Sequence, residues 1–151
     1  MQPFDEIIPR LERDILPVMQ NWSKELERDF TSIQVKLNTT RSDNPSPFDK
    51  YFYSIYITCS KKGATKFPEF GDLVLSVDLK QRDDTSHPKL SAEVGMLVDE
   101  ESEGDWGFNP IAKPFANDQE VTEDVFQILE KTLPHLYNSL RTFLEKTGIE
   151  Q

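Results

Sequence analysis

The chain has 151 residues, the length of one domain, and 36% of them are hydrophobic, so it can bury a core without disulfides or metals. Its 27 Asp and Glu residues outnumber 17 Lys and Arg residues, which gives a net charge of −10. This balance argues against a nucleic acid or an anionic membrane as the partner, since both need a positive surface, and it favours a partner with a basic surface. We therefore expect a single α+β domain over residues 1–151.

The first segment of the chain and the single cysteine of the protein indicate in which cellular compartment it resides. Residues 1–15, MQPFDEIIPRLERDI, carry charges within every apolar run, so they predict neither a secretory signal nor a transmembrane span. Cys59 has no second cysteine with which to form a disulfide, which suits a reducing environment. We expect a cytoplasmic protein.

An amphipathic helix is predicted at the start of the chain. Apolar residues recur at steps of three or four from Phe4 to Phe30, with charged residues between them. Pro17 falls inside this pattern, where a proline costs about 3 kcal/mol and kinks or breaks a helix. We expect a bend or break near Leu16.

Four segments with a period of two follow. Alternation of apolar with polar residues is typical of strands that have one face on a core, and the connections between these segments contain no helical pattern. The segments therefore predict an antiparallel meander, with loops that include RSDNPSPFD. They are SIQVKLN (32–38), KYFYSIYITCS (50–60), LVLSVDLKQR (73–82) and LSAEVGMLVD (90–99).

The helical period returns between Val121 and Phe143, after Thr122 as a plausible N-cap, and Pro134 is expected to interrupt it. The predicted architecture is α-β-β-β-β-α: a four-stranded antiparallel meander with N-terminal and C-terminal helices packed on one face. The other face is half polar, and we expect it to be open to solvent. It carries Phe52, Ser54, Tyr56, Thr58, Val74, Ser76, Asp78 and Lys80.

The stretch VDEESEGDWGFNPIAKPF, residues 98–115, is the main candidate for a functional surface. Carboxylates beside aromatic residues are typical of an interface that attracts a basic partner by charge and holds it by an aromatic anchor. Two other interpretations remain open: an extended solvated loop, and aromatic side chains that cap the core. A calcium site is not favoured, because the spacing of a calcium-binding loop is absent. The predicted partner-binding residues are Asp99, Glu100, Glu101, Glu103, Asp105, Trp106 and Phe108.

The sequence contains no recognisable catalytic motif. Cys59 shares its strand face with apolar residues, so it is expected in the core, and His87 and His135 are too few for a zinc site with one cysteine. There is no nucleophile elbow and no phosphate-binding glycine loop. We predict no catalytic residues, no metal and no cofactor.

The functional hypothesis is a non-enzymatic binding module for a protein with a basic surface, acting as an adaptor, a chaperone or an inhibitor. Bacterial immunity proteins and secretion chaperones share its small size and acidity, a likeness that transfers no residues. The alternative is a small-molecule binder or enzyme whose pocket lies between sheet and helices. That pocket would be lined by Tyr51, Tyr53, Tyr56 and Trp106. A homodimer is left open.

Overall fold

The computed structural model describes residues 4–62, 72–100 and 105–146, with the side chains of 98–107 excepted. Three helices and six strands lie in this part of the chain, where the sequence predicted four strands. In chain order they are α1 (Phe4–Asp14), α2 (Leu16–Asp29), β1 (Ile33–Ser46), β2 (Asp49–Lys61), β3 (Leu73–Gln81), β4 (Lys89–Glu100), β5 (Asp105–Pro110), β6 (Phe115–Asn117) and α3 (Glu123–Lys146).

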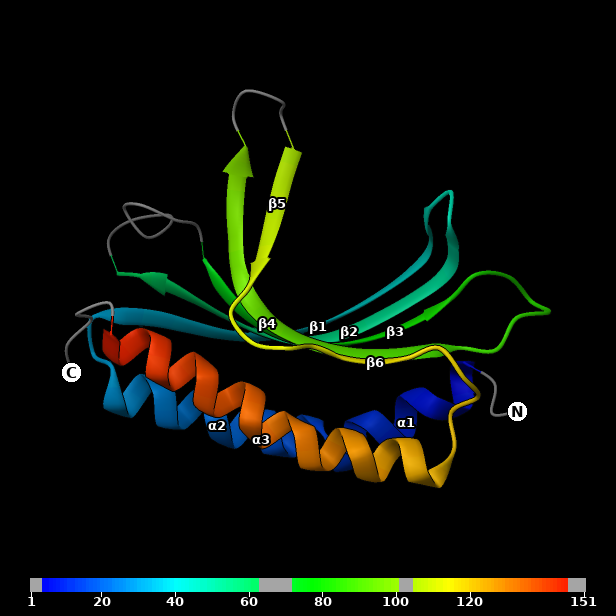
Figure 1. The fold of residues 1–151 in the computed structure, drawn as a ribbon, viewed down its shortest axis with the longest axis horizontal. Coiled ribbons are helices and arrows are strands. Elements are labelled where there is room, and N and C mark those ends of the chain that lie inside the picture. Colours follow the sequence, from blue (N-terminus) through cyan, green and yellow to red (C-terminus); the bar gives the residue numbers. More distant parts are fainter. Residues whose placement is uncertain (1–3, 63–71, 101–104, 147–151) are drawn as a thin grey trace.

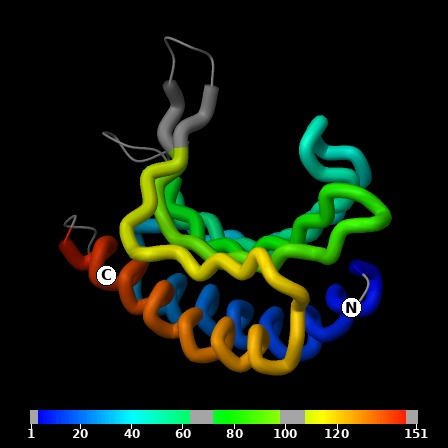
Figure 2. The backbone as a smooth tube through the Cα atoms, turned by 45° about the vertical axis from the view of Figure 1, so that its right-hand side comes forward, coloured from blue at the N-terminus to red at the C-terminus, as the bar shows by residue number. Residues whose placement is uncertain are grey.

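The strands form one antiparallel sheet in the order β1-β2-β3-β4-β5, with β6 also paired to β4. All three helices lie on the same face of this sheet, as expected (Figure 1). The sheet curves away from the helices, so that the end of the β1–β2 hairpin and the β4–β5 hairpin rise on the opposite side (Figures 1 and 2). The helix-free face is therefore concave.

The predicted break in the N-terminal helix is confirmed. The first helix ends at Asp14 and the second begins at Leu16, with Ile15 between them and Pro17 in the first turn of α2. A proline is tolerated there because the first N–H groups of a helix have no partner within it. The two shorter helices follow the curved sheet above them (Figure 1).

The predicted interruption at Pro134 does not occur. The last helix runs unbroken from Glu123 to Lys146, and Pro134 lies on its exposed side, where water can satisfy the freed carbonyl group. The opposite side of α3 buries a full stripe of apolar residues, which outweighs the cost of the proline. No helix among the described residues has the length and apolarity needed to cross a membrane.

The predicted loop RSDNPSPFD lies mostly in strands. Strand β1 continues to Ser46 and β2 begins at Asp49, so most of the segment RSDNPSPFD belongs to a long hairpin. Its register shifts between Asp43 and Ser46, where Asn44 has a φ of 53°. Asparagine adopts this left-handed conformation more readily than most residues, and one irregular residue lets pairing resume beyond it.

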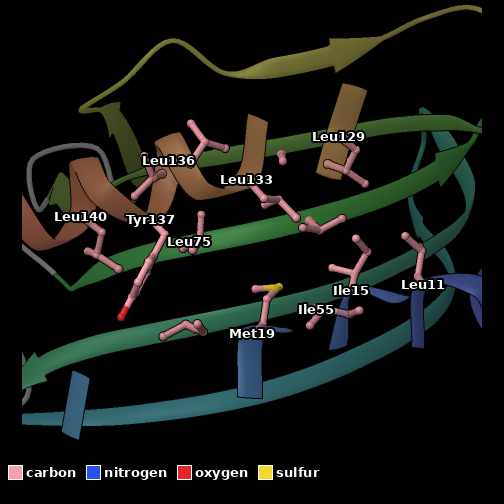
Figure 3. Close-up of a cluster of buried hydrophobic side chains, with 14 of the residues drawn as sticks. Leu11, Ile15, Met19, Ile55, Leu75, Leu129, Leu133, Leu136, Tyr137 and Leu140 are labelled. Atoms are coloured by element: carbon pink, nitrogen blue, oxygen red, sulfur yellow. The ribbon is translucent and has the colours of Figure 1, made fainter. Parts of the chain in front are cut away.

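The space between helices and sheet is filled by apolar side chains. Figure 3 shows Leu11, Ile15 and Met19 of the N-terminal segment on the side of Ile55 of β2, while Tyr137 of α3 lies beside Leu75 of β3. All of these side chains are buried in one continuous cluster. The core therefore lies on the convex side of the sheet.

Two arginines attach α3 to the other helices. The Arg141 guanidinium donates to the Asp29 carboxylate at 2.9 Å and to the Tyr137 hydroxyl at 3.3 Å. Tyr137 also stacks on Trp22, with ring centroids 4.5 Å apart. At the other end of α3, Arg10 lies over the ring of Phe126, 3.9 Å from its centroid. These contacts fix the helix at two separated points.

Cys59 is fully buried, and burial together with the nearby Asp72 carboxylate raises the pKa of its thiol to about 12. We predict that Cys59→Ser lowers the free energy of unfolding by about 1–2 kcal/mol, because it places a poorly satisfied hydroxyl among apolar groups. Urea denaturation measures this loss. Rapid labelling of the native thiol by a bulky reagent would contradict the placement of Cys59.

Candidate functional site

The concave face is formed by alternate residues of β2, β3 and β4. The register places Ser54 opposite Asp78 and Asp78 opposite Ser91 in one row across the strands. In the next row, Ser76 of β3 lies between Tyr56 of β2 and Glu93 of β4. Polar side chains from three strands thus meet near the middle of this face.

Several of these side chains are buried, contrary to the expected open face. Asp78 and Ser76 are each 8% exposed and Ser54 is 4% exposed, although no helix covers them. On a concave surface side chains converge and shield one another from water, which a flat sheet would not do. The curvature of the sheet is therefore the physical reason for the difference.

Asp78 is the buried charged group at the centre of this face. Ser76 Oγ donates to Asp78 Oδ2 over a long 3.4 Å, and Ser54 also hydrogen-bonds the carboxylate. Burial raises the pKa of Asp78 above its ordinary range; the two hydroxyls and the charge of Lys80 oppose this rise without cancelling it. The carboxylate is thus costly to ionise where it lies.

Glu93 lies diagonally across β3 and β4 from Asp78, on the same face. It is partly buried, and its pKa is raised first by burial and then by repulsion from Asp78. Neither carboxylate makes an ion pair with any described cation. These two neighbouring carboxylates, of which Asp78 disfavours the charge of Glu93, form the chemical centre of the concave face, and we call them the carboxylate pair.

Aromatic side chains border the carboxylate pair. Phe52 and Tyr56 lie on β2, and the Tyr56 hydroxyl is 3.5 Å from Thr40 Oγ1 of β1. Phe108 of β5 lies over Gly95, where an added Cβ would stand only 2.8 Å from Phe108 Cζ. Gly95 is therefore required by the close approach of β5, and it places the Phe108 ring at the border of this face.

The structure places the predicted acidic site on a hairpin. Asp99 pairs with Trp106 and Glu100 with Asp105 across strands β4 and β5, so this part of the stretch is not the loop that we expected. Backbone pairing reaches into the acidic stretch on two strands that project from the body of the sheet (Figure 1). Glu101 and Glu103 lie outside the described residues.

Phe108 is the predicted site residue whose side chain the structure describes, and it lies at the border of the concave face. It is partly buried and lies directly opposite Leu97 on β4. Its ring lies close to Gly95 of β4, on the helix-free side of the sheet. The orientation of the Trp106 side chain is outside what the structure describes.

The tyrosines of the alternative pocket are not brought together. Tyr53 points to the helices and is buried, whereas Tyr56 belongs to the opposite, concave face. The Tyr51 hydroxyl donates to Asp84 at 2.7 Å, at the far end of β2. Among the described residues there is also no group of three or more His, Cys, Asp or Glu that could hold a metal ion.

The carboxylate pair was missed by sequence reasoning although its residues were visible. The alternation in 73–82 and 90–99 assigns Asp78 and Glu93 to polar positions, but their proximity depends on the strand register. A polar residue in a strand also gives no sign of burial on the helix-free side. The signal available was only a charge between apolar neighbours on two adjacent strands.

Comparison with protein-family models, curated proteins and solved structures found no match for this chain.

The raised pKa values of the carboxylate pair predict a pH dependence of stability. Where the pH lies between the ordinary and the raised pKa, the folded state binds more protons than the unfolded state, so stability falls as pH rises through this window. Asp78→Asn should remove the part of this fall in stability that is due to Asp78. We expect a gain of about 1 kcal/mol at neutral pH, which is roughly 2–4 °C in melting temperature, and no gain near pH 3.

Thermal unfolding followed by circular dichroism from pH 3 to pH 8 measures this effect. Asp43→Asn is the matched control, because Asp43 is an exposed strand residue without an ion pair to any residue that the structure describes. Equal pH profiles for both variants would contradict a penalty at Asp78.

Proposed function

We propose that the protein is a non-enzymatic protein-binding module that holds a basic segment of its partner against the concave face. The observation that carries the proposal is the carboxylate pair: Asp78 is buried and Glu93 is partly buried on a helix-free face, and neither makes an ion pair with a described cation. A buried carboxylate is unfavourable unless it is paired. An arriving cation would remove this cost.

Lysine and arginine side chains fit the carboxylate pair. A guanidinium group donates hydrogen bonds in a planar fork to carboxylates, and a lysine ammonium can donate to two acceptors at once. Ser54 and Ser76 already contact Asp78, so they would hold the carboxylate in place while the cation binds. The net charge of −10 would attract a basic partner from a distance.

The surroundings favour a protein segment as the ligand. Phe52, Tyr56 and Phe108 border the carboxylate pair and offer apolar area beside the charges, the composition of a protein interface. The concave face continues onto the projecting β4–β5 hairpin, whose carboxylates could steer the partner (Figure 1). A longer ligand can use both regions.

A small-molecule function has support at the same place. Two carboxylates with raised pKa values are also a usual feature of acid–base sites in enzymes. A small cationic ligand would contact the carboxylate pair alone, whereas a protein segment would extend to the aromatic border and the hairpin. The extent of the binding footprint therefore separates the two functions.

The test uses a short peptide rich in Arg and Lys as the probe, titrated into the isotope-labelled full chain and followed by NMR. We expect amide shifts over β3, β4 and β2 on the concave face. Asp78→Asn and Glu93→Gln should each weaken binding about fivefold to tenfold, which is roughly 1–1.4 kcal/mol. Glu130→Gln, which removes one exposed carboxylate from α3, should change affinity less than about twofold.

Equal losses for the three variants would show that the peptide responds only to net charge and would refute the proposal. Guanidinium-containing small molecules that bind as tightly as the peptide, with shifts confined to the carboxylate pair, would favour the small-molecule function instead.

The β4–β5 hairpin should contribute to the rate of binding. Replacing Glu100, Glu101, Glu103 and Asp105 with their amides should slow association and flatten its salt dependence, because exposed charges act mainly on encounter and are screened over about 8 Å. Trp106→Ala should instead speed dissociation at a cost on the order of 2 kcal/mol, as for an aromatic anchor. Surface plasmon resonance on the immobilised basic peptide, at low and high salt, separates these effects. Unchanged rates in both variants would remove the hairpin from the proposed interface.

A further inference from the structure

A polar hollow lies at the end of the concave face, between the turn that joins β1 to β2 and the turn that joins β3 to β4. Its volume is about 670 Å³, within the size range of small-ligand sites. Four of its lining residues are basic or imidazole side chains and two are acidic. They are Lys80, Arg82, His87, Lys89, Asp49 and Asp118.

Two lysines of this hollow are placed unfavourably with respect to each other. Lys80 and Lys89 are directly opposite each other on β3 and β4, a position in which like charges destabilise a sheet. Neither they nor Arg82 make an ion pair within the part of the chain that the structure describes. This is notable in a chain with 27 carboxylates, which could readily supply a partner.

Carboxylates on the adjacent turn are engaged elsewhere. Asp83 Oδ1 accepts hydrogen bonds from the backbone and hydroxyl groups of Thr85 and Ser86, which lower its pKa to about 2. Asp84 is bound by Lys50 and Tyr51. The turn is thus held by its own acidic residues, while the neighbouring cations keep their charge for another ligand.

The remaining wall groups suit an oxyanion. His87 Nε2 is 2.9 Å from the carbonyl oxygen of Asp118, which can only accept, so Nε2 donates and the ring is held at the wall of the hollow. Arginine offers a fork of donors to oxyanions and lysine a compact charge. Phe48 lies at the rim, 77% exposed, where it can cover an organic group attached to the anion.

We propose that this hollow binds a phosphate group through Lys80, Arg82 and Lys89. The hollow adjoins the carboxylate pair, because the charge of Lys80 also acts on Asp78 and Glu93, but phosphate binding does not depend on the proposed protein-binding function. Phosphate can arrive as the free ion or as an organic monoester, and the two share the same contacts with the cations.

The test titrates the isotope-labelled full chain with inorganic phosphate and, separately, with phenyl phosphate, at ionic strength held constant with sodium chloride. We expect saturable NMR shifts that are concentrated in residues 80–89 and at Phe48 and Asp49. Lys89→Gln and Arg82→Gln should each weaken binding about fivefold or more. Lys131→Gln, an exposed lysine on α3, is the control of equal charge change and should leave affinity unaltered.

The two probes identify the source of the phosphate group. Tighter binding of phenyl phosphate, lost in Phe48→Ala, assigns the site to an organic monoester, whereas equal binding assigns it to the free ion. Shifts that do not saturate, or equal losses in Lys89→Gln and Lys131→Gln, would overturn the proposal. In each variant, resonances remote from the substituted residue that stay unshifted show that the fold is intact.

Discussion

One-sided burial of a curved sheet is the constraint on which the molecule depends. The helices bury apolar side chains against the convex face, and this contact supplies the core. The concave face has no such cover, so its residues must shield one another through curvature alone. That arrangement can bury a serine or an aspartate, such as Ser54 or Asp78, while leaving the region above them open to a ligand.

The convex side shows how the fold holds this curvature. Helix α3 is attached to α2 by the stacked Trp22 and Tyr137 and by Arg141, and to α1 by Arg10. Both arginines place aliphatic stems and planar charged groups against aromatic rings, which combines apolar contact with cation–π attraction. Because these attachments lie on the helix side, substitutions on the concave face can change its chemistry with little effect on the core.

The parts of the fold that follow from local pattern were predictable, and those that follow from pairing were not. The alternation around Cys59 was sufficient to place it in the core, and Pro17 was sufficient to place the helix break. The acidic stretch near Glu100 was expected to be a loop because like charges repel, yet cross-strand pairing extends as far as Glu100 and Asp105. Asp78 and Glu93 became a candidate site only when the register placed them together on a curved surface. Register and curvature are properties of the whole sheet, and no short window of sequence contains them.

The position of α3 at the end of the chain order has a consequence for folding during synthesis. The Tyr137 hydroxyl donates to Glu25 across a sequence separation of 112 residues, so the contact between α2 and α3 forms only after every strand has been made. Until α3 leaves the ribosome, the apolar side chains that it covers on β3 and β4, such as Leu75, lack their partner. A nascent chain of this protein therefore presents an uncovered apolar sheet surface. Incomplete chains aggregate through such surfaces or are bound there by chaperones.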